Sequence, residues 1–123
     1  MDVTSLFSSG NILTFLNRES VSFEFKILKV KLLDNVIISI IETPPPAPDN
    51  NNVFAYSTDG KFLWRIDTNV PLVAYGKAYC PFIDIDTAEN NGYPNQLMLY
   101  NWCTSALRVN PITGEILERY ESH

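Results

Sequence analysis

The sequence has few of the residues that build metal or catalytic centres, with two cysteines and one histidine among 123 residues. That number is too small for a closed structural zinc site unless carboxylates complete it. The sequence also contains no glycine-rich phosphate loop, no Gly-x-Ser-x-Gly elbow and no cysteine pair at zinc-binding spacing. We therefore expect no catalytic residues, no metal site and no cofactor.

Basic residues are scarce as well, with nine Lys and Arg against 14 Asp and Glu and a net charge of −5. Nucleic acids and anionic membrane surfaces are both bound by clusters of Lys and Arg. We therefore expect neither nucleic acid nor a membrane as a partner. The acidic balance permits a basic protein partner, but it serves solubility equally well.

Long apolar runs are absent, since no stretch approaches the ~20 residues needed to span a bilayer. The start, Met1-Asp2-Val3-Thr4-Ser5, lacks the basic region and the continuous apolar stretch of a signal peptide. We therefore expect a cytoplasmic protein. In that compartment Cys80 and Cys103 would be reduced thiols packed as small apolar side chains. The sequence alone leaves a bridge between them open.

Helical patterns are missing too, because no window carries apolar residues at helical spacing between capping residues. Aromatic residues make up 12% of the chain, which suits pleated sheets. The length fits a single β domain over residues 1–123. Apolar or alternating segments bounded by turn residues predict strands at 11–17, 21–33, 36–42, 53–56, 61–66, 82–86, 97–102, 106–109 and 115–120.

Two of these segments carry more detailed predictions. From Val21 to Leu33 the apolar alternation changes phase near Ile27-Leu28, which predicts a bulge or bend. The segment from Val36 to Glu42 is almost continuously apolar. It is therefore expected to be a central strand buried on both faces, or a strand at an interface.

The chain also contains an internal repeat. Residues 35–40 are similar to residues 96–101, and residues 53–66 are similar to residues 106–119. Each half reads as an apolar strand, a loop, a second strand, a turn with a glycine, and a third strand. The proline-rich segment 43–52, expected to be an extended and exposed loop, is an insertion in the first half. The repeat predicts one unit over about 11–67 and a second over about 78–121.

The stretch from Val53-Phe54-Ala55-Tyr56 through Asp59-Gly60 to Lys61-Phe62-Leu63-Trp64-Arg65 resembles a blade of the quinoprotein-type β-propeller repeat. That motif is a strand ending in an aromatic residue or Asp, a turn with Gly, and a strand carrying Trp. The resemblance covers about half of the chain and implies blade-like meanders. A closed propeller needs at least ~4 blades, and the sequence has material for two. No residue matches a quinone-binding site, so no site residues are carried over.

The expected fold is therefore all-β, with two blade-like β-meander units packed as a sandwich or as a partly open twisted barrel. Each unit is too thin to cover its own apolar face. The units can cover one another, or open faces and edges can pair between two copies, which would give a homodimer.

Acidic side chains cluster at one place in the sequence. Asp84 and Asp86 point to the same side of a predicted strand, with Glu89 shortly after them. Such carboxylates could hold a hard cation or serve a hydrolase. The favoured interpretation is a solvated strand edge that leads into an Asn-Gly turn.

The aromatic residues divide into an expected core and an expected surface. We expect Trp64 and Trp102 to pack in the core. Tyr75, Tyr79 and Tyr93 lie in the irregular central region and are the candidates for surface recognition, because tyrosine is enriched at interfaces. A core or loop-anchoring role is the alternative for each of them.

These observations favour a non-catalytic protein-interaction or accessory module, including an immunity- or inhibitor-like role. The first alternative is a β domain that binds a small ligand or carbohydrate between its aromatic residues. The second is a hydrolase that uses the acidic residues near 84–89, for which no base, nucleophile and oxyanion arrangement can be named.

Overall fold

The structure is a computed structural model that describes residues 4–44, 49–70, 72–73 and 79–121. The predicted all-β class is confirmed, since within these ranges helix is limited to two short turns. No helix in the described part of the chain is long and apolar enough to cross a membrane. In chain order the elements are α1 (Thr4–Phe7), β1 (Ser8–Ser9), β2 (Ile12–Thr14), β3 (Ser20–Ser22), β4 (Ile27–Leu33), β5 (Val36–Ile41), β6 (Val53–Ser57), β7 (Phe62–Arg65), β8 (Phe82–Ala88), the 3-10 turn η1 (Glu89–Asn91), β9 (Tyr93–Asn101), β10 (Ser105–Val109) and β11 (Ile116–Glu121).

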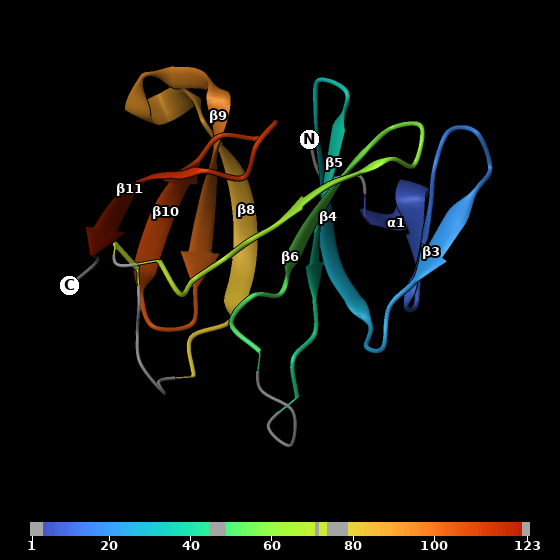
Figure 1. Cartoon of the computed structure of the whole chain (residues 1–123), viewed down its shortest axis with the longest axis horizontal. Coiled ribbons are helices and arrows are strands. Elements are labelled where there is room, and N and C mark those ends of the chain that lie inside the picture. Colours follow the sequence, from blue (N-terminus) through green and yellow to red (C-terminus); the bar gives the residue numbers. More distant parts are fainter. Residues whose placement is uncertain (1–3, 45–48, 71, 74–78, 122–123) are drawn as a thin grey trace.

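The strands form three antiparallel sheets that pack as layers (Figure 1). Strands β1–β3 form a small N-terminal sheet, β4–β7 form the first meander, and β8–β11 form the second meander. In Figure 1 the teal-to-green first meander lies between the blue N-terminal sheet and the gold-to-red second meander. The two meanders packed on one another form the sandwich that the sequence predicts, and none of the sheets formed by the described residues closes into a barrel. The third layer is not predicted by the sequence.

The larger core lies between the two meanders. It includes Ile38 and Ile40 from β5, Phe82 from β8, Leu99 from β9 and Leu107 from β10, all without measurable exposure. Fully burying an aliphatic or aromatic side chain of this size contributes about 1.5–3 kcal/mol. This core therefore joins the two meanders into one folding unit.

A second core lies between the first meander and the N-terminal sheet. Leu13 and Phe15 cover Ile37, Ile41 and Tyr56 there. Successive residues of a strand point to opposite faces, so β5 supplies alternate side chains to the two cores. This explains why all six residues of β5 are buried, as the sequence predicts for 36–42.

The predicted bulge near Ile27-Leu28 is confirmed, because the pairing of β4 with β5 shifts register between Ile27 and Lys29. The prediction of one bent strand over 21–33 is wrong, however. The backbone leaves the sheet after Ser22 and re-enters at Ile27, so its two parts belong to different layers. The phase change marks a crossing between layers as well as a bulge.

Two hairpin turns each contain a glycine, and an aromatic ring from the neighbouring layer packs against each glycine. Gly60, between β6 and β7, has φ +89°, and a Cβ there would lie 2.8 Å from the Phe15 ring. Gly114, between β10 and β11, has φ +77°, and a Cβ there would lie 2.6 Å from the Trp64 ring. The Trp64 indole nitrogen also donates to the Pro111 carbonyl, 2.7 Å away. The core position predicted for Trp64 is confirmed, and its ring ties the first meander to the second.

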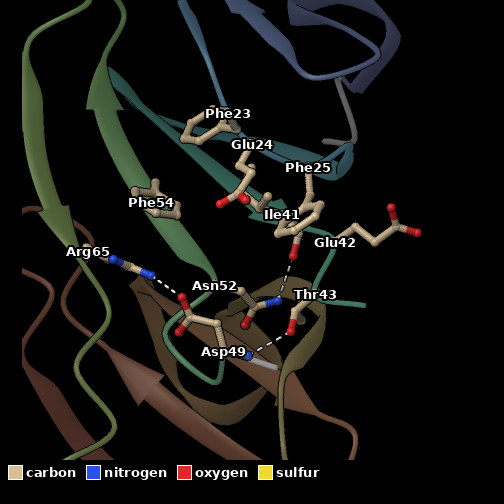
Figure 2. A pocket seen from close by; sticks show the side chains of 10 residues that line it. All are labelled: Phe23, Glu24, Phe25, Ile41, Glu42, Thr43, Asp49, Asn52, Phe54 and Arg65. Carbon is tan, nitrogen blue, oxygen red and sulfur yellow. Dashed lines mark hydrogen bonds and ion pairs between the residues drawn. The ribbon is translucent and has the colours of Figure 1, made fainter. Parts of the chain in front are cut away.

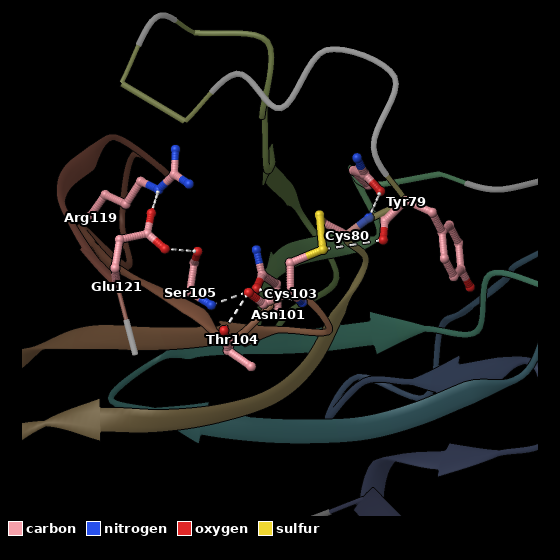
Figure 3. The surroundings of a disulfide bond; sticks show 9 residues. Tyr79, Cys80, Asn101, Cys103, Thr104, Ser105, Arg119 and Glu121 are labelled. Carbon is pink, nitrogen blue, oxygen red and sulfur yellow. Dashed lines mark hydrogen bonds and ion pairs between the residues drawn. A yellow bond between two sulfur atoms is a disulfide. The ribbon is translucent and has the colours of Figure 1, made fainter. Parts of the chain in front are cut away.

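A disulfide joins Cys80 and Cys103, so the expectation of two reduced thiols is wrong (Figure 3). The pairing of β8 with β9 explains the bond. Phe82 pairs with Asn101, and the two cysteines lie two residues beyond that pair on each side. Antiparallel register therefore places their Cα atoms 5.3 Å apart.

The core position expected for Trp102 is also wrong, since its side chain is 65% exposed. The predicted strand 97–102 is shifted toward the C-terminus, because β9 runs from Tyr93 to Asn101 and Trp102 lies in the turn before β10. Thr104 in the same turn has φ +64°, and the Asn101 side chain accepts the backbone N–H groups of Cys103 and Ser105.

The proline-rich insertion is described only in part, since residues 45–48 lie outside the described ranges. At its end, Asn52 is buried and connects the two meanders. Its amide donates to the carbonyls of Ile41 and Phe82, and its oxygen accepts the Phe82 N–H. Its side-chain amide and oxygen thus bond to backbone groups at the end of β5 and the start of β8.

Candidate functional site

Among the described residues, those predicted to bind a ligand do not form one site. Tyr75 lies outside the described residues. Tyr79 precedes the disulfide, and its hydroxyl donates to the Thr43 carbonyl, which anchors the two loops to each other. Tyr93 begins β9 in a different part of the molecule, where the Arg108 guanidinium lies over its ring.

Asp84 and Asp86 lie on β8, at the edge of the second meander that contacts β4. Asp84 forms an ion pair with Lys29, and Asp86 lies 3.7 Å from the Lys31 ammonium. The two pairs join the edges of the two meanders. Within the described ranges no group of three metal-ligating residues is present. The geometry therefore gives these carboxylates a structural partner each.

The outer face of the second meander carries a polar cluster around Arg108. Its guanidinium lies 3.8 Å from the centre of the Tyr93 ring and donates to Gln96 (2.6 Å) and to the Tyr120 hydroxyl (3.2 Å). A hydrogen bond with the Glu118 carboxylate raises the pKa of Tyr120. These side chains are hydrogen-bonded to or stacked on one another, so we interpret the cluster as a structural network on the surface of the sheet.

A hollow lies elsewhere, between the bend at 23–26 and the first meander (Figure 2). This hollow, which we call the groove, has a volume of about 480 Å³. The bend between β3 and β4, the end of β5 with the residues after it, the residues before β6, and the strands β6 and β7 all contribute to it. Its lining residues are Phe23, Glu24, Phe25, Ile41, Glu42, Thr43, Asp49, Asn52, Phe54 and Arg65.

One wall of the groove is aromatic. The rings of Phe23 and Phe54 lie 5.1 Å apart, and Phe25 lies across from them beside Ile41 (Figure 2). Arg65 reaches over this wall, with its guanidinium 4.7 Å from the centre of the Phe54 ring. It also forms an ion pair with Asp49. Cations are attracted to the negative face of an aromatic ring, so the groove already holds one cation of the chain itself.

Two further carboxylates belong to the groove. Both side chains are exposed, and Figure 2 shows the Glu24 carboxylate on the side of Phe54 and Ile41, whereas the Glu42 carboxylate points away from them. Among the described residues neither glutamate lies within ion-pair distance of a basic group. The groove thus combines apolar rings with negative charge that the described residues leave uncompensated.

Sequence reasoning missed the groove because it placed Phe23-Glu24-Phe25 in a regular strand. In a strand, Glu24 would point away from both rings. The structure shows a bend at 23–26, which allows all three side chains to line one hollow. The change of phase near Ile27 was the available signal, but it does not say to which side the bent residues turn.

Comparison with known proteins adds a family but no activity. The model of a domain family of unknown function, DUF7957, matches residues 3–120. No curated protein and no solved structure matches the chain.

Proposed function

Because the chain belongs to the DUF7957 family, whose function is unknown, we propose from its structure that it is a non-catalytic protein-interaction module that docks a basic partner in the groove. One observation carries this proposal: an open hollow in an acidic domain combines three phenylalanine rings with carboxylates that lack a basic partner among the described residues. Hollows of this kind accept the anchor side chains that dominate binding energy at interfaces.

The charge of the domain supports a basic partner. A net charge of −5 steers a positively charged protein toward the domain and speeds association at low salt. An acidic module that covers the active site of a basic enzyme would act as an inhibitor or immunity protein. This version of the proposal predicts that the purified partner loses activity when the domain is bound.

The test is site-specific photo-cross-linking in the source cell. A photoreactive phenylalanine analogue replaces Phe25 in the groove, and the matched control replaces Phe62, which is exposed on β7 outside the groove. We expect a basic protein to be captured from position 25 and not from position 62. The purified partner should then bind the domain, and Glu24→Lys should weaken that binding at least tenfold through charge repulsion.

Two results would overturn the proposal. In the first, position 25 captures no protein beyond the background at position 62. In the second, the captured protein binds Glu24→Lys as tightly as it binds the unchanged domain. A cross-link between two copies of the chain would identify self-association as the role of the groove and would replace the basic partner.

The volume of the groove also favours a second candidate function, binding of a small ligand or carbohydrate. Sites for small molecules commonly enclose ≈ 300–1,000 Å³, and the groove has about 480 Å³. Neutral sugars stack on aromatic rings without needing a carboxylate of the Glu24 kind. A screen of neutral sugars by thermal shift, repeated on Phe25→Ala, tests this candidate, and shifts that survive the substitution would remove the groove from it.

A further inference from the structure

The groove already holds one cationic side chain of the domain, that of Arg65, and its contacts indicate how a cation is bound there. The Arg65 guanidinium lies over the Phe54 ring, pairs with the Asp49 carboxylate, and donates to the Asn51 carbonyl from Nε at 2.7 Å. These are a ring face, a carboxylate and a backbone carbonyl. Together they are the three kinds of group that recognise a guanidinium or ammonium ion in proteins.

The other half of the groove offers two of these kinds of group, rings and a carboxylate. Phe23 and Phe25 supply rings, and Glu24, which is exposed, supplies a carboxylate that lines the same hollow (Figure 2). The carbonyl oxygens at the two ends of the bend are already used, since Phe23 accepts from the Asn11 side-chain amide and Lys26 accepts from the Glu42 N–H. Arg65 is held on the opposite wall by Asp49, and among the described residues no other basic side chain lines the hollow.

We infer that this half of the groove binds one positively charged side chain, lysine or arginine, presented by the partner. The inference rests on the function proposed above and names the chemistry of its anchor. The incoming cation would lie against Phe23 and Phe25 and pair with Glu24. Its contacts would be of the same kind as those of Arg65, which lies over the Phe54 ring and pairs with Asp49.

Other classes of anchor fit the groove less well. A carboxylate or phosphate would be repelled by Glu24 and by Glu42 at the rim. A neutral apolar side chain would cover the rings but would remove water from Glu24 without replacing it, and an unpaired carboxylate is costly to desolvate. A cation satisfies both the rings and the carboxylate. Its long apolar stem can also lie along the apolar wall.

The test is a titration of the whole domain followed by NMR chemical shifts. The probes are blocked pentapeptides with one central residue among glycines: arginine, lysine, citrulline or norleucine. Citrulline keeps the shape of arginine without its charge, and norleucine keeps the apolar stem of lysine. We expect the charged probes to shift the signals of Phe23, Glu24 and Phe25, and to bind at least fivefold more tightly than their neutral counterparts.

Three variants separate the contributions of charge and ring. Glu24→Gln should weaken binding of the charged probes by about two- to fivefold, and Glu42→Gln should weaken it less, because its carboxylate points away. Phe25→Leu keeps the wall apolar but removes a ring, and should weaken binding by about two- to fivefold for the charged probes only. The control is Glu89→Gln, an exposed carboxylate on η1 outside the groove, which should have no effect.

The outcomes distinguish this inference from the proposed function. Equal binding of norleucine and lysine probes in the groove, unchanged by Glu24→Gln, would overturn the cation anchor and leave a protein-binding groove with an apolar anchor. Charged probes that shift signals outside the groove would also overturn it. If the free amides of arginine and lysine bind as tightly as the peptides, the groove takes small cations instead of a partner's side chain. If no probe binds and cross-linking at position 25 is also negative, the proposed function fails as well.

Discussion

The two meanders have the same strand order but are covered differently. The first has a core on each face, against the second meander and against the N-terminal sheet. The second has one core, and its other face carries Tyr100, Arg108 and Tyr120. Their central strands show the difference: all six residues of β5 are buried, whereas Tyr100 of β9 is exposed.

The number of layers that cover a meander is therefore visible in the side chains of its central strand. A strand covered on both faces has only buried side chains, and a strand covered on one face does not. On the outer face β5 places Ile37 and Ile41, which need a second covering sheet. On the outer face of β9, opposite the core residues Leu97 and Leu99, Met98 is buried and Tyr100 is exposed. Amphipathic side chains such as tyrosine can lie half in water, so the second meander needs no third layer. The groove lies where the extra layer of the first meander ends.

A substitution at Ile37 is the most direct test of the difference between the two meanders. Ile37→Ala removes a side chain without measurable exposure from the core under the N-terminal sheet, and should lower the free energy of unfolding by about 2–5 kcal/mol. Tyr100→Ala on the open face should lower it by less than about 1 kcal/mol. Urea denaturation measures both. Equal losses would mean that the N-terminal sheet does not form a true third layer.

The sequence carries enough information for the strands and hairpin turns of both meanders. Alternation and glycine turns place β6, β7, β8 and β10 within a residue or two of their predicted positions. The continuous apolar run of β5 indicates burial on both faces. The sequence does not reveal that the second cover comes from the first 22 residues of the chain. The predicted strand 11–17 contains β2 (Ile12–Thr14), but β1 has two residues and β3 has three, which is too short for a pattern of period two to identify.

The site was harder to predict than the fold for a physical reason. A sequence indicates binding residues where aromatic or acidic residues are close together along the chain, as at Asp84 and Asp86. In the structure those carboxylates pair with lysines of β4, a strand more than fifty residues earlier. The groove is likewise assembled from four separate segments. Contacts between distant segments depend on how layers stack, and local patterns do not report that.

The second-largest effect should come from the disulfide, which constrains only the second meander. Replacing Cys80 and Cys103 together by serine opens a link between residues 23 positions apart and should lower the free energy of unfolding by about 3 kcal/mol. Hydrogen exchange should accelerate in β8 and β9 and remain slow in β5, which is held by two cores. Uniform acceleration across both meanders would contradict the distinction between them.

The packing of rings on glycines should give the next effect. Gly114→Ala adds a Cβ that would meet the Trp64 ring at 2.6 Å, in a backbone conformation with φ +77°. We expect a loss of about 2–4 kcal/mol in the free energy of unfolding, from overpacking and backbone strain together. Gly92→Ala is the matched control, because Gly92 has φ +88° but open space around it. It should lose about 1–2 kcal/mol from strain alone.

Gly60→Ala makes the corresponding change in the first meander, where the Phe15 ring of the N-terminal layer is the neighbour at 2.8 Å. Thermal and urea unfolding of the three variants allow a direct comparison. If Gly114→Ala and Gly92→Ala lose the same stability, the Trp64 ring gives way easily and does not interlock the two meanders.

The smallest expected effect is on the pKa values of two tyrosines, one in each meander. Burial raises the pKa of Tyr56, which lies in the second core. Burial also raises the pKa of Tyr100, and the nearby carboxylates of Asp86 and Asp84 raise it further. In both cases the folded state holds the phenolic proton more tightly than the unfolded state. The stability that this provides is present below the ordinary tyrosine pKa of about 10 and is lost as the pH rises through the folded-state value.

Added salt separates the two tyrosines, because salt screens exposed charges and leaves desolvation almost unchanged. Ultraviolet titration of tyrosinate in Tyr56→Phe and Tyr100→Phe identifies each signal by its disappearance. In about 1 M salt the pKa of Tyr100 should move back toward its ordinary value, while the pKa of Tyr56 should stay where it is. The double variant Asp84→Asn with Asp86→Asn should lower the pKa of Tyr100 in the same way at low salt. If salt moves both tyrosines equally, the open face of the second meander is no more exposed to solvent than the covered face of the first.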